Sequence, residues 1–169
     1  MTPDASDGMP LGRKVALILV LATAIVVVDL WTKAAFERAF SGQPMRYFLG
    51  DTVRVGFVLN SGVFLSLGHA LGPQTRFWLF VVGVSGVLTL LAGLTLKDGR
   101  FRAPEVAAVA AIIGGGIGNL VDRVQLGAVR DFLNLGIGPL RTGIFNVADV
   151  AITFGGIALI LIPFIRKRK

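Results

Sequence analysis

Four long apolar segments constrain this chain more than any other feature of its sequence. They cover residues 15–36, 77–96, 104–121 and 145–165. A membrane-spanning helix needs roughly 20 predominantly apolar residues. With 54% hydrophobic residues, 16% charged residues and a mean hydropathy of +0.75, the chain is too apolar for an ordinary soluble domain. We predict an all-α membrane protein with four transmembrane helices in a single membrane-embedded domain, residues 1–169.

Basic residues at the ends of these segments predict the orientation of the chain. An Arg-Lys pair precedes the first segment, residues 97–103 are rich in basic side chains, and residues 166–169 read RKRK. Short cytoplasmic loops carry an excess of Lys and Arg. We therefore expect both termini in the cytoplasm and two outer segments, 38–76 and 122–144. This clustering accounts for the net charge of +7, and we expect no nucleic acid partner.

The first apolar segment is also compatible with a cleaved signal peptide. Arg13 and Lys14 would form its basic start and residues 15–28 its apolar core. Asp29 directly follows that core, and no convincing small-residue cleavage site lies just beyond it. We favour a retained membrane-spanning helix.

Several catalytic chemistries are excluded by composition. The chain has no cysteine, which excludes a Cys nucleophile, a Cys-ligated metal and disulfides. It has one histidine, His69, which excludes a His-rich metal site and is expected in a loop before Gly72. A Ser-His pair lacks the supporting G-x-S-x-G motif.

The first outer segment, residues 38–76, differs from the apolar ones. It contains MRYFLGDTVRVGFVLNSGVFLSLG, in which Val, Phe and Gly residues favour short β-strands with bends. A single hairpin is marginally stable in water. We expect these strands to lean on the membrane surface or on the helices.

Asp29 and Lys33 are four residues apart and share one face of the first helix. They either neutralise each other near the membrane interface, with Lys33 reaching outward, or support a site at the outer end of the helix.

The stretch GGGIGNLVDR, residues 114–123, closes the third apolar segment. Gly114 and Gly118 form a small-xxx-small pair that predicts close packing of another helix. Asp122 and Arg123 form either an ion pair at the helix end or part of a polar site. A phosphate-binding loop is unsupported, because no strand precedes the stretch and the P-loop Lys is missing.

Two further aspartates lie at the outer side. Asp131 follows the third segment, and Asp149 lies three residues after Asn146 at the start of the fourth. Taken singly, Asp131 is a loop residue and Asp149 an ion-pair partner of an arginine. A charged residue inside an apolar helix is costly and marks a functional site. Two carboxyl groups that share one proton can activate water and polarise a carbonyl.

These motifs together resemble signal peptidase II, the lipoprotein signal peptidase family of bacteria. Five blocks match in order. DLWTK (29–33) is similar to the family's D-x-x-[ST]-K, NSG (60–62) to the start of its N-x-G block, and GGGIGNLVDR (114–123) to its G-G-x-x-G-N-x-x-D-R. VRDF (129–132) and FNVAD (145–149) are similar to the blocks that carry the two catalytic aspartates.

The resemblance implies an aspartic endopeptidase of the bacterial inner membrane with a small periplasmic β-cradle. It implies cleavage of prolipoproteins just before a diacylglyceryl-modified Cys, with Asp131 and Asp149 as the catalytic pair. Asn60, Gly62, Asn119, Asp122, Arg123, Asn146, Asp29 and Lys33 would line or support the site. No metal or organic cofactor is implied. The expected partners are lipid-modified prolipoproteins and membrane lipids, and we expect a monomer.

Two departures from the family pattern concern substrate range. The stretch Val63-Phe64-Leu65 is bulkier than the small residues usual after Asn-x-Gly, and Arg130 replaces an apolar residue before the first aspartate. A cation within about 4–6 Å favours an ionised carboxylate and would unbalance the pair. In an extended segment, neighbouring side chains point to opposite faces and this effect shrinks.

Two other functions fit parts of the sequence. A small proton-coupled transporter would use intramembrane carboxylates as a relay, but the second apolar segment has no ionisable residue. A non-cleaving paralogue that binds lipoproteins would keep the fold with a compromised aspartate pair. A presenilin-like protease is disfavoured because its G-x-G-D motif is absent.

Overall fold

The computed structural model describes residues 8–62 and 72–166. In this part of the chain, four helical segments are long and apolar enough to cross a membrane, as predicted. They are α1 (Leu11–Phe40), the second span, α4 (Ala103–Leu126) and α5 (Val147–Arg166). The second span is built from α2 (Pro73–Phe77), the π-helical turn η3 (Trp78–Gly83) and α3 (Val84–Lys97). The first helix is longer at both ends than the predicted segment 15–36.

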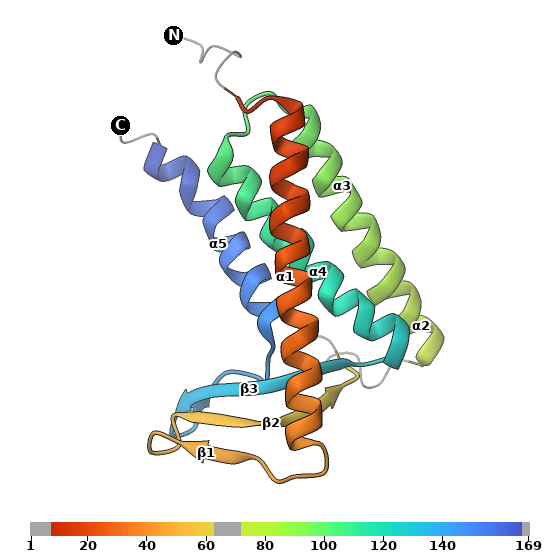
Figure 1. Ribbon diagram of the computed structural model, residues 1–169, viewed down its shortest axis with the longest axis vertical. Coiled ribbons are helices and arrows are strands. Elements are labelled where there is room, and N and C mark those ends of the chain that lie inside the picture. Colours follow the sequence, from red (N-terminus) through yellow and green to blue (C-terminus); the bar gives the residue numbers. More distant parts are fainter. Residues whose placement is uncertain (1–7, 63–71, 167–169) are drawn as a thin grey trace.

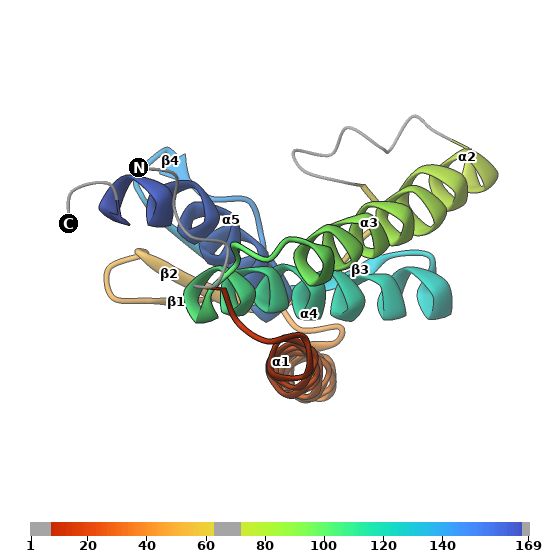
Figure 2. The same ribbon diagram turned by 90° about the horizontal axis from the view of Figure 1, so that it is seen from above.

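Helix α4 lies at the centre of the bundle, with α1, α3 and α5 around it (Figure 2). Of its apolar window, 56% is buried, against at most 11% in the other three spans. The lipid-facing surfaces therefore belong mainly to the outer three helices, as expected where a membrane replaces water as the solvent of apolar side chains.

Glycines let α1 and α5 approach α4 closely. A Cβ at Gly114 would lie 2.9 Å from the backbone of Ala22 in α1, and one at Gly118 would collide with Asp29 of the same helix. Gly115 abuts the carbonyl of Ala148 in α5. The predicted small-xxx-small contact is confirmed: its partner is α1.

A four-stranded antiparallel sheet lies across one end of the bundle, in the order β1-β2-β3-β4 (Figure 1). The strands are β1 (Arg46–Phe48), β2 (Val53–Asn60), β3 (Val129–Ile137) and β4 (Leu140–Arg141). The sequence predicts strands only within 38–76, whereas β3 and β4 come from the second outer segment. Asp131 is thus a strand residue and not a loop residue. Its strand was missed because β3 pairs with β2, some 70 residues away, where Asp131 lies opposite Val58.

The start of α1 and the end of α5 lie at the end of the bundle opposite the sheet (Figure 1). There, the buried side chain of Lys14 donates hydrogen bonds to the carbonyls of Thr95 (3.1 Å) and Asp98 (2.6 Å). The sequence predicts Lys14 as an orientation signal or as part of the basic start of a signal peptide. It also ties α1 to the last carbonyls of α3, where a cation is favourable.

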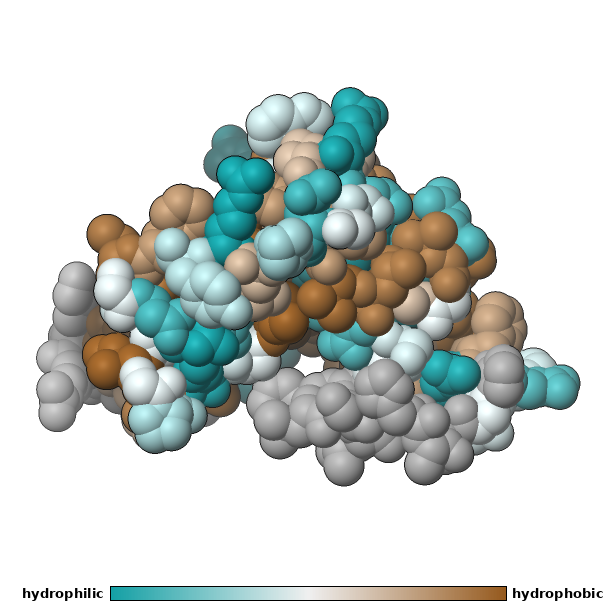
Figure 3. Space-filling model, turned by 90° about the horizontal axis from the view of Figure 1, so that it is seen from below, coloured by the Kyte–Doolittle hydropathy of each residue, from teal (hydrophilic) through white to brown (hydrophobic). Residues whose placement is uncertain are grey.

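The sheet end of the molecule presents hydrophilic and apolar residues side by side (Figure 3). Apolar side chains are exposed at the two turns of the sheet: Leu49 at 79%, Ile137 at 78% and Leu140 at 83%. Exposed apolar residues at this density suit a surface that contacts the membrane boundary.

Candidate active site

Strand β3 holds Asp131 in a buried position at the junction of sheet and helices. Its side chain is almost inaccessible, because the residue is only 2% exposed. Asn60, the last residue of β2, donates a hydrogen bond from Nδ2 to Asp131 Oδ2 at 2.9 Å. The Asn60 Oδ1 atom accepts the backbone N–H of Gly62 at 3.0 Å. The NSG turn therefore orients Asn60 toward Asp131.

Asp149 is presented by the first turn of α5. Asn146 precedes this helix, and its Oδ1 accepts the backbone N–H of Asp149 at 3.0 Å. In return, Asp149 Oδ2 accepts the backbone N–H of Asn146 at 3.2 Å. This reciprocal pair is a capping box with Asn and Asp in place of Ser and Glu. It explains locally why FNVAD begins a helix and why Asp149 has one fixed orientation.

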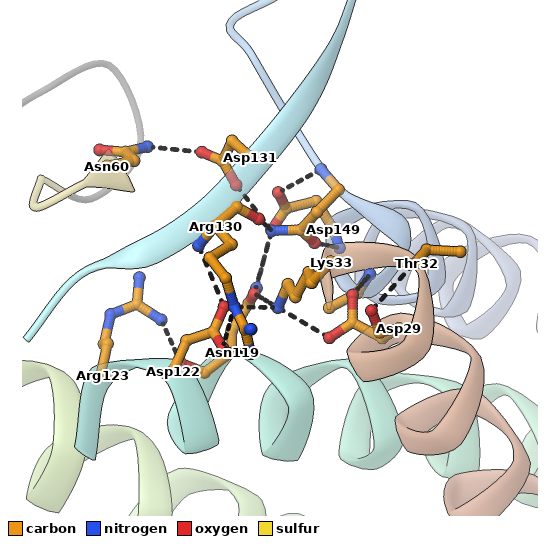
Figure 4. Close-up of polar contacts among 12 residues, drawn as sticks. Asp29, Thr32, Lys33, Asn60, Asn119, Asp122, Arg123, Arg130, Asp131 and Asp149 are labelled. Atoms are coloured by element: carbon orange, nitrogen blue, oxygen red, sulfur yellow. Dashed lines mark hydrogen bonds and ion pairs between the residues drawn. The ribbon is translucent and has the colours of Figure 1, made fainter. Parts of the chain in front are cut away.

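Two asparagines join the two aspartates, and Figure 4 labels one of them, Asn119, together with Asp131 and Asp149. Asn146 Nδ2 donates to Asp131 Oδ1 at 2.7 Å and to Asn119 Oδ1 at 3.1 Å. Asn119 Nδ2 in turn donates to Asp149 Oδ1 at 2.8 Å. Both carboxyl groups are therefore hydrogen-bonded to Asn146, which is 1% exposed. Residues from α4, β3 and α5 that are far apart in sequence converge on one polar centre.

A fully buried lysine lies beneath this centre. Lys33 Nζ lies 2.7 Å from Asp29 Oδ2 and 3.2 Å from Asp122 Oδ2, and all three side chains have zero exposure. Lys33 also donates to Asn119 Oδ1 at 3.0 Å. The predicted Asp29–Lys33 pair forms, but Lys33 points into the bundle and not outward to the interface. Buried charges of this kind need opposite partners at close range.

Each of the two buried carboxylates next to Lys33 binds the backbone directly before one of the aspartates. Asp29 Oδ1 accepts the N–H of Ala148, the residue before Asp149, at 2.9 Å. Asp122 Oδ2 accepts the N–H of Arg130, the residue before Asp131, at 3.0 Å. Lys33 thus links the supports of both aspartates through a single ammonium group.

Arg130 points away from Asp131, as the extended strand requires. Its Nη2 lies 2.6 Å from Asp122 Oδ1, and its Nη1 lies 3.1 Å from Glu37 Oε2. The hydrogen bonds to Asp122 and Glu37 raise the pKa of Arg130 above its ordinary value. Sequence reasoning missed Glu37, although it continues the four-residue spacing of Asp29 and Lys33 along one face of α1.

The ion pair between Asp122 and Arg123, one of the two readings of the sequence, is wrong. Asp122 pairs with Lys33 and Arg130. Arg123 donates to the carbonyl of Asn119 at 3.2 Å, and its guanidinium lies 5.9 Å from the centre of the Phe80 ring. Consecutive helix residues are separated by about 100°, so the two side chains serve different neighbours.

A cavity of about 510 Å³ adjoins this centre. Asn60, Arg76, Phe80 and Arg123 are among the residues that line it. The cavity can therefore accommodate a peptide segment: the two guanidinium groups can donate to its backbone, and apolar walls can contact its side chains. The stretch Val63-Phe64-Leu65 and His69 lie outside the described residues.

The electrostatic environment separates Asp131 from an ordinary surface carboxyl group. Burial raises the pKa of Asp131 to about 6, and the nearby charge of Asp149 acts in the same direction. The hydrogen bonds from Asn60 and Asn146 oppose this rise because they stabilise the ionised form. Within residues 8–62 and 72–166, no group of three or more acidic or His side chains is arranged to hold a metal ion.

The fold and this centre define a multi-pass membrane protein with a pair of carboxyl groups, one buried and one half-buried, at one end of its helix bundle. A family model described as signal peptidase (SPase) II matches residues 21–165. The chain belongs to the signal peptidase II family.

Curated relatives support this membership. The lipoprotein signal peptidase of Sulfurihydrogenibium sp. (strain YO3AOP1) is 35% identical over 147 residues, which cover 86% of this chain and 89% of the relative. That of Geobacillus thermodenitrificans (strain NG80-2) is 32% identical over 158 residues, which cover 90% of this chain and 92% of the relative.

Solved structures share the fold. Two bacterial membrane enzymes superpose with TM-scores of 0.72 and 0.74 at 24% and 23% identity. The first alignment covers 90% of this chain and 89% of the other, and the second covers 92% and 95%.

Proposed function

We propose that this protein is an aspartic endopeptidase that removes the signal peptide of diacylglyceryl-modified prolipoproteins by cutting before the lipidated Cys. Its family membership supports the reaction class and the prolipoprotein substrate. The observation that carries the aspartic mechanism is the convergence of Asp131 and Asp149 on Asn146. Two carboxyl groups in one polar centre can supply an acid and a base without a metal.

The two aspartates have different roles in this mechanism. Asp131, whose raised pKa favours the protonated form, donates a hydrogen bond to the scissile carbonyl oxygen. Asp149 accepts a proton from a water molecule, whose oxygen attacks the carbonyl carbon. Asp149 then passes the proton that it took from water to the amide nitrogen. The C–N bond breaks, and the signal peptide carboxylate and the amine of the lipidated Cys are released.

Asn60, Asn119 and Asn146 hold the two carboxyl groups in place. Arg123 lines the cavity beside Asn60, where it can donate hydrogen bonds to backbone carbonyls of the substrate. Three charged residues act through the groups that hold the aspartates and not on the substrate itself: Asp29, Lys33 and Asp122. Their fixed charges preorganise the site, which is the main source of catalytic power in water-excluded centres.

The position of the site at one end of the spans suits a lipid-anchored substrate. In the orientation favoured by the basic residues, the sheet faces the periplasm and both termini face the cytoplasm. The lipidated Cys then meets the aspartates at the membrane boundary, and the exposed apolar turns at Leu49 and Leu140 rest on the lipid surface. A single chain contains all these residues, so a monomer is sufficient.

A cleavage assay tests the proposal. The purified protein in detergent is given a diacylglyceryl-modified prolipoprotein, and the shortened product is followed on a gel. We expect Asp131→Asn and Asp149→Asn each to abolish cleavage, while Asp98→Asn, at the opposite end of the bundle, retains it. Cleavage that persists in both dyad variants would show that the site is misassigned. Binding without cleavage by the wild type would favour the non-cleaving paralogue.

A further inference from the structure

Arg130 is the residue at which strand β3 is fastened to the helix bundle. Its backbone N–H, Nε and Nη2 donate to the carboxylate of Asp122 at 3.0, 3.0 and 2.6 Å. Asp122 lies on α4 and is completely buried. Nε and Nη2 share Oδ1, and the backbone N–H binds Oδ2, so both oxygens of the carboxylate hold Arg130. Charge-assisted contacts to both oxygens fix direction as well as distance. The contact therefore determines how β3 passes over the end of α4.

A third element contributes to the same fastening. Arg130 Nη1 lies 3.1 Å from Glu37 Oε2 on α1. The side chain of Arg130 is 12% exposed and that of Glu37 is 41% exposed. The ion pair with Asp122 is thus shielded from solvent. The ion pair with Glu37 orients the outer edge of the guanidinium but contributes less free energy, because solvent screens it.

The contacts of Arg130 also affect the position of Asp131, because the two residues are joined by a peptide bond. Arg130 and Asp131 point to opposite faces of β3, so holding one side chain determines where the other points. Asn146 Nδ2 contacts both residues, at 2.7 Å to Asp131 Oδ1 and 3.4 Å to the carbonyl of Arg130. A small shift of β3 at Arg130 would lengthen these contacts.

We infer that Arg130 is a positioning residue for Asp131, which it holds in reach of Asn60 and Asn146 through its contacts with Asp122 and Glu37. This inference rests on the proposed function. It also assigns a role to the cation that departs from the family pattern: Arg130 braces the strand and leaves the charge of the aspartate pair unaltered.

The test replaces Arg130 with Val, which removes the cation and keeps a strand-forming side chain. We expect kcat to fall about 10- to 100-fold and KM to change less than about twofold, since misplacement of a reacting group by about 1 Å has effects of this size. Arg130→Lys should lie between the wild type and Arg130→Val, because a single ammonium group cannot reproduce the contacts of a guanidinium with Asp122 and Glu37 together. Glu37→Gln should lower kcat less than about threefold.

The pH profile distinguishes positioning from a purely structural role. The charged groups near Asp131 are Asp149 on α5, Lys33 on α1 and Arg123 on α4, and the substitution leaves all of them in place. If the asparagine contacts lengthen, the ionised form of Asp131 loses stabilisation. The alkaline limb of kcat should then move to higher pH in Arg130→Val, and Arg130→Lys should restore part of the shift.

Arg54→Val is the matched control. Arg54 makes a bidentate pair with Asp51 in the same sheet, with both contacts at 2.7 Å, but this pair lies at the β1–β2 turn. We expect its kcat and pH limb to match those of the wild type. A lower melting temperature of Arg130→Val with unchanged kcat and pH limb would overturn the positioning role. If Arg130→Val does not fold, the same comparison is made with Arg130→Lys. Absence of cleavage by the wild type would instead contradict the proposed function.

Discussion

Asp29 of α1 accepts a hydrogen bond from the backbone N–H of Ala148 in α5, although the two residues are 119 positions apart. The contact places a carboxylate at the N-terminus of α5, where the helix dipole favours a negative charge. It also explains why an acidic residue persists in an apolar span: Asp29 faces Lys33 and a helix end, and not lipid.

The role of Asp29 predicts a large loss of stability on its removal. In Asp29→Ala, Lys33 loses its nearest carboxylate, and the backbone N–H of Ala148 at the start of α5 loses its acceptor. Breaking a buried ion pair costs about 3–5 kcal/mol, so we expect the free energy of unfolding in detergent to fall by about that amount. Asp51→Ala, which removes a carboxylate from an exposed turn, should have a much smaller effect. Equal losses in the two variants would contradict this account.

The close approach of α1 and α4 predicts a contrast between two glycines. Gly118→Ala would place a methyl group against Asp29, whereas a Cβ at Gly93 meets no atom within 4 Å. We expect Gly118→Ala to destabilise the protein by about 1–3 kcal/mol. Gly93→Ala should be neutral or stabilising by up to about 1 kcal/mol, because alanine favours the helix. Thermal unfolding in detergent measures both, and destabilisation by Gly93→Ala alone would refute the packing.

The raised pKa of Asp131 predicts the pH dependence of cleavage. Below its pKa of about 6 the group holds the proton that the mechanism needs, so kcat/KM of the wild type should fall as the pH rises past that value. Asn60 stabilises the ionised form, and its loss in Asn60→Ala should raise the pKa and move the alkaline limb to higher pH. A limb that moves to lower pH would contradict the assignment of the acid.

The orientation can be read with introduced cysteines, because the chain has none of its own. Gln43, in the connection between α1 and β1, and Arg100, in the connection before α4, are both exposed. A membrane-impermeant maleimide should label Gln43→Cys in spheroplasts and Arg100→Cys only after the membrane is opened. The reverse pattern would place the termini outside.

The positions of the four spans and of the first turn of α5 could be predicted from sequence because these features are local. Apolar length marks each helix. The Asn146–Asp149 capping box and the Gly114–Gly118 pair are encoded within a few residues of each other. The five motif blocks also identified the residues that meet at the polar centre, since the resemblance carried information that local patterns lack.

Only the tertiary structure decided which of these residues touch. Strand β3 exists because β2, brought from the other outer segment, satisfies its backbone hydrogen bonds, and no local pattern near Asp131 reveals that partner. Likewise, the sequence was compatible with an outward-pointing Lys33 and with an ion pair between Asp122 and Arg123. The packing of α1 against the glycines of α4 buried Lys33 between Asp29 and Asp122. Because buried charges need opposite charges at close range, Lys33 pairs with both of these carboxylates.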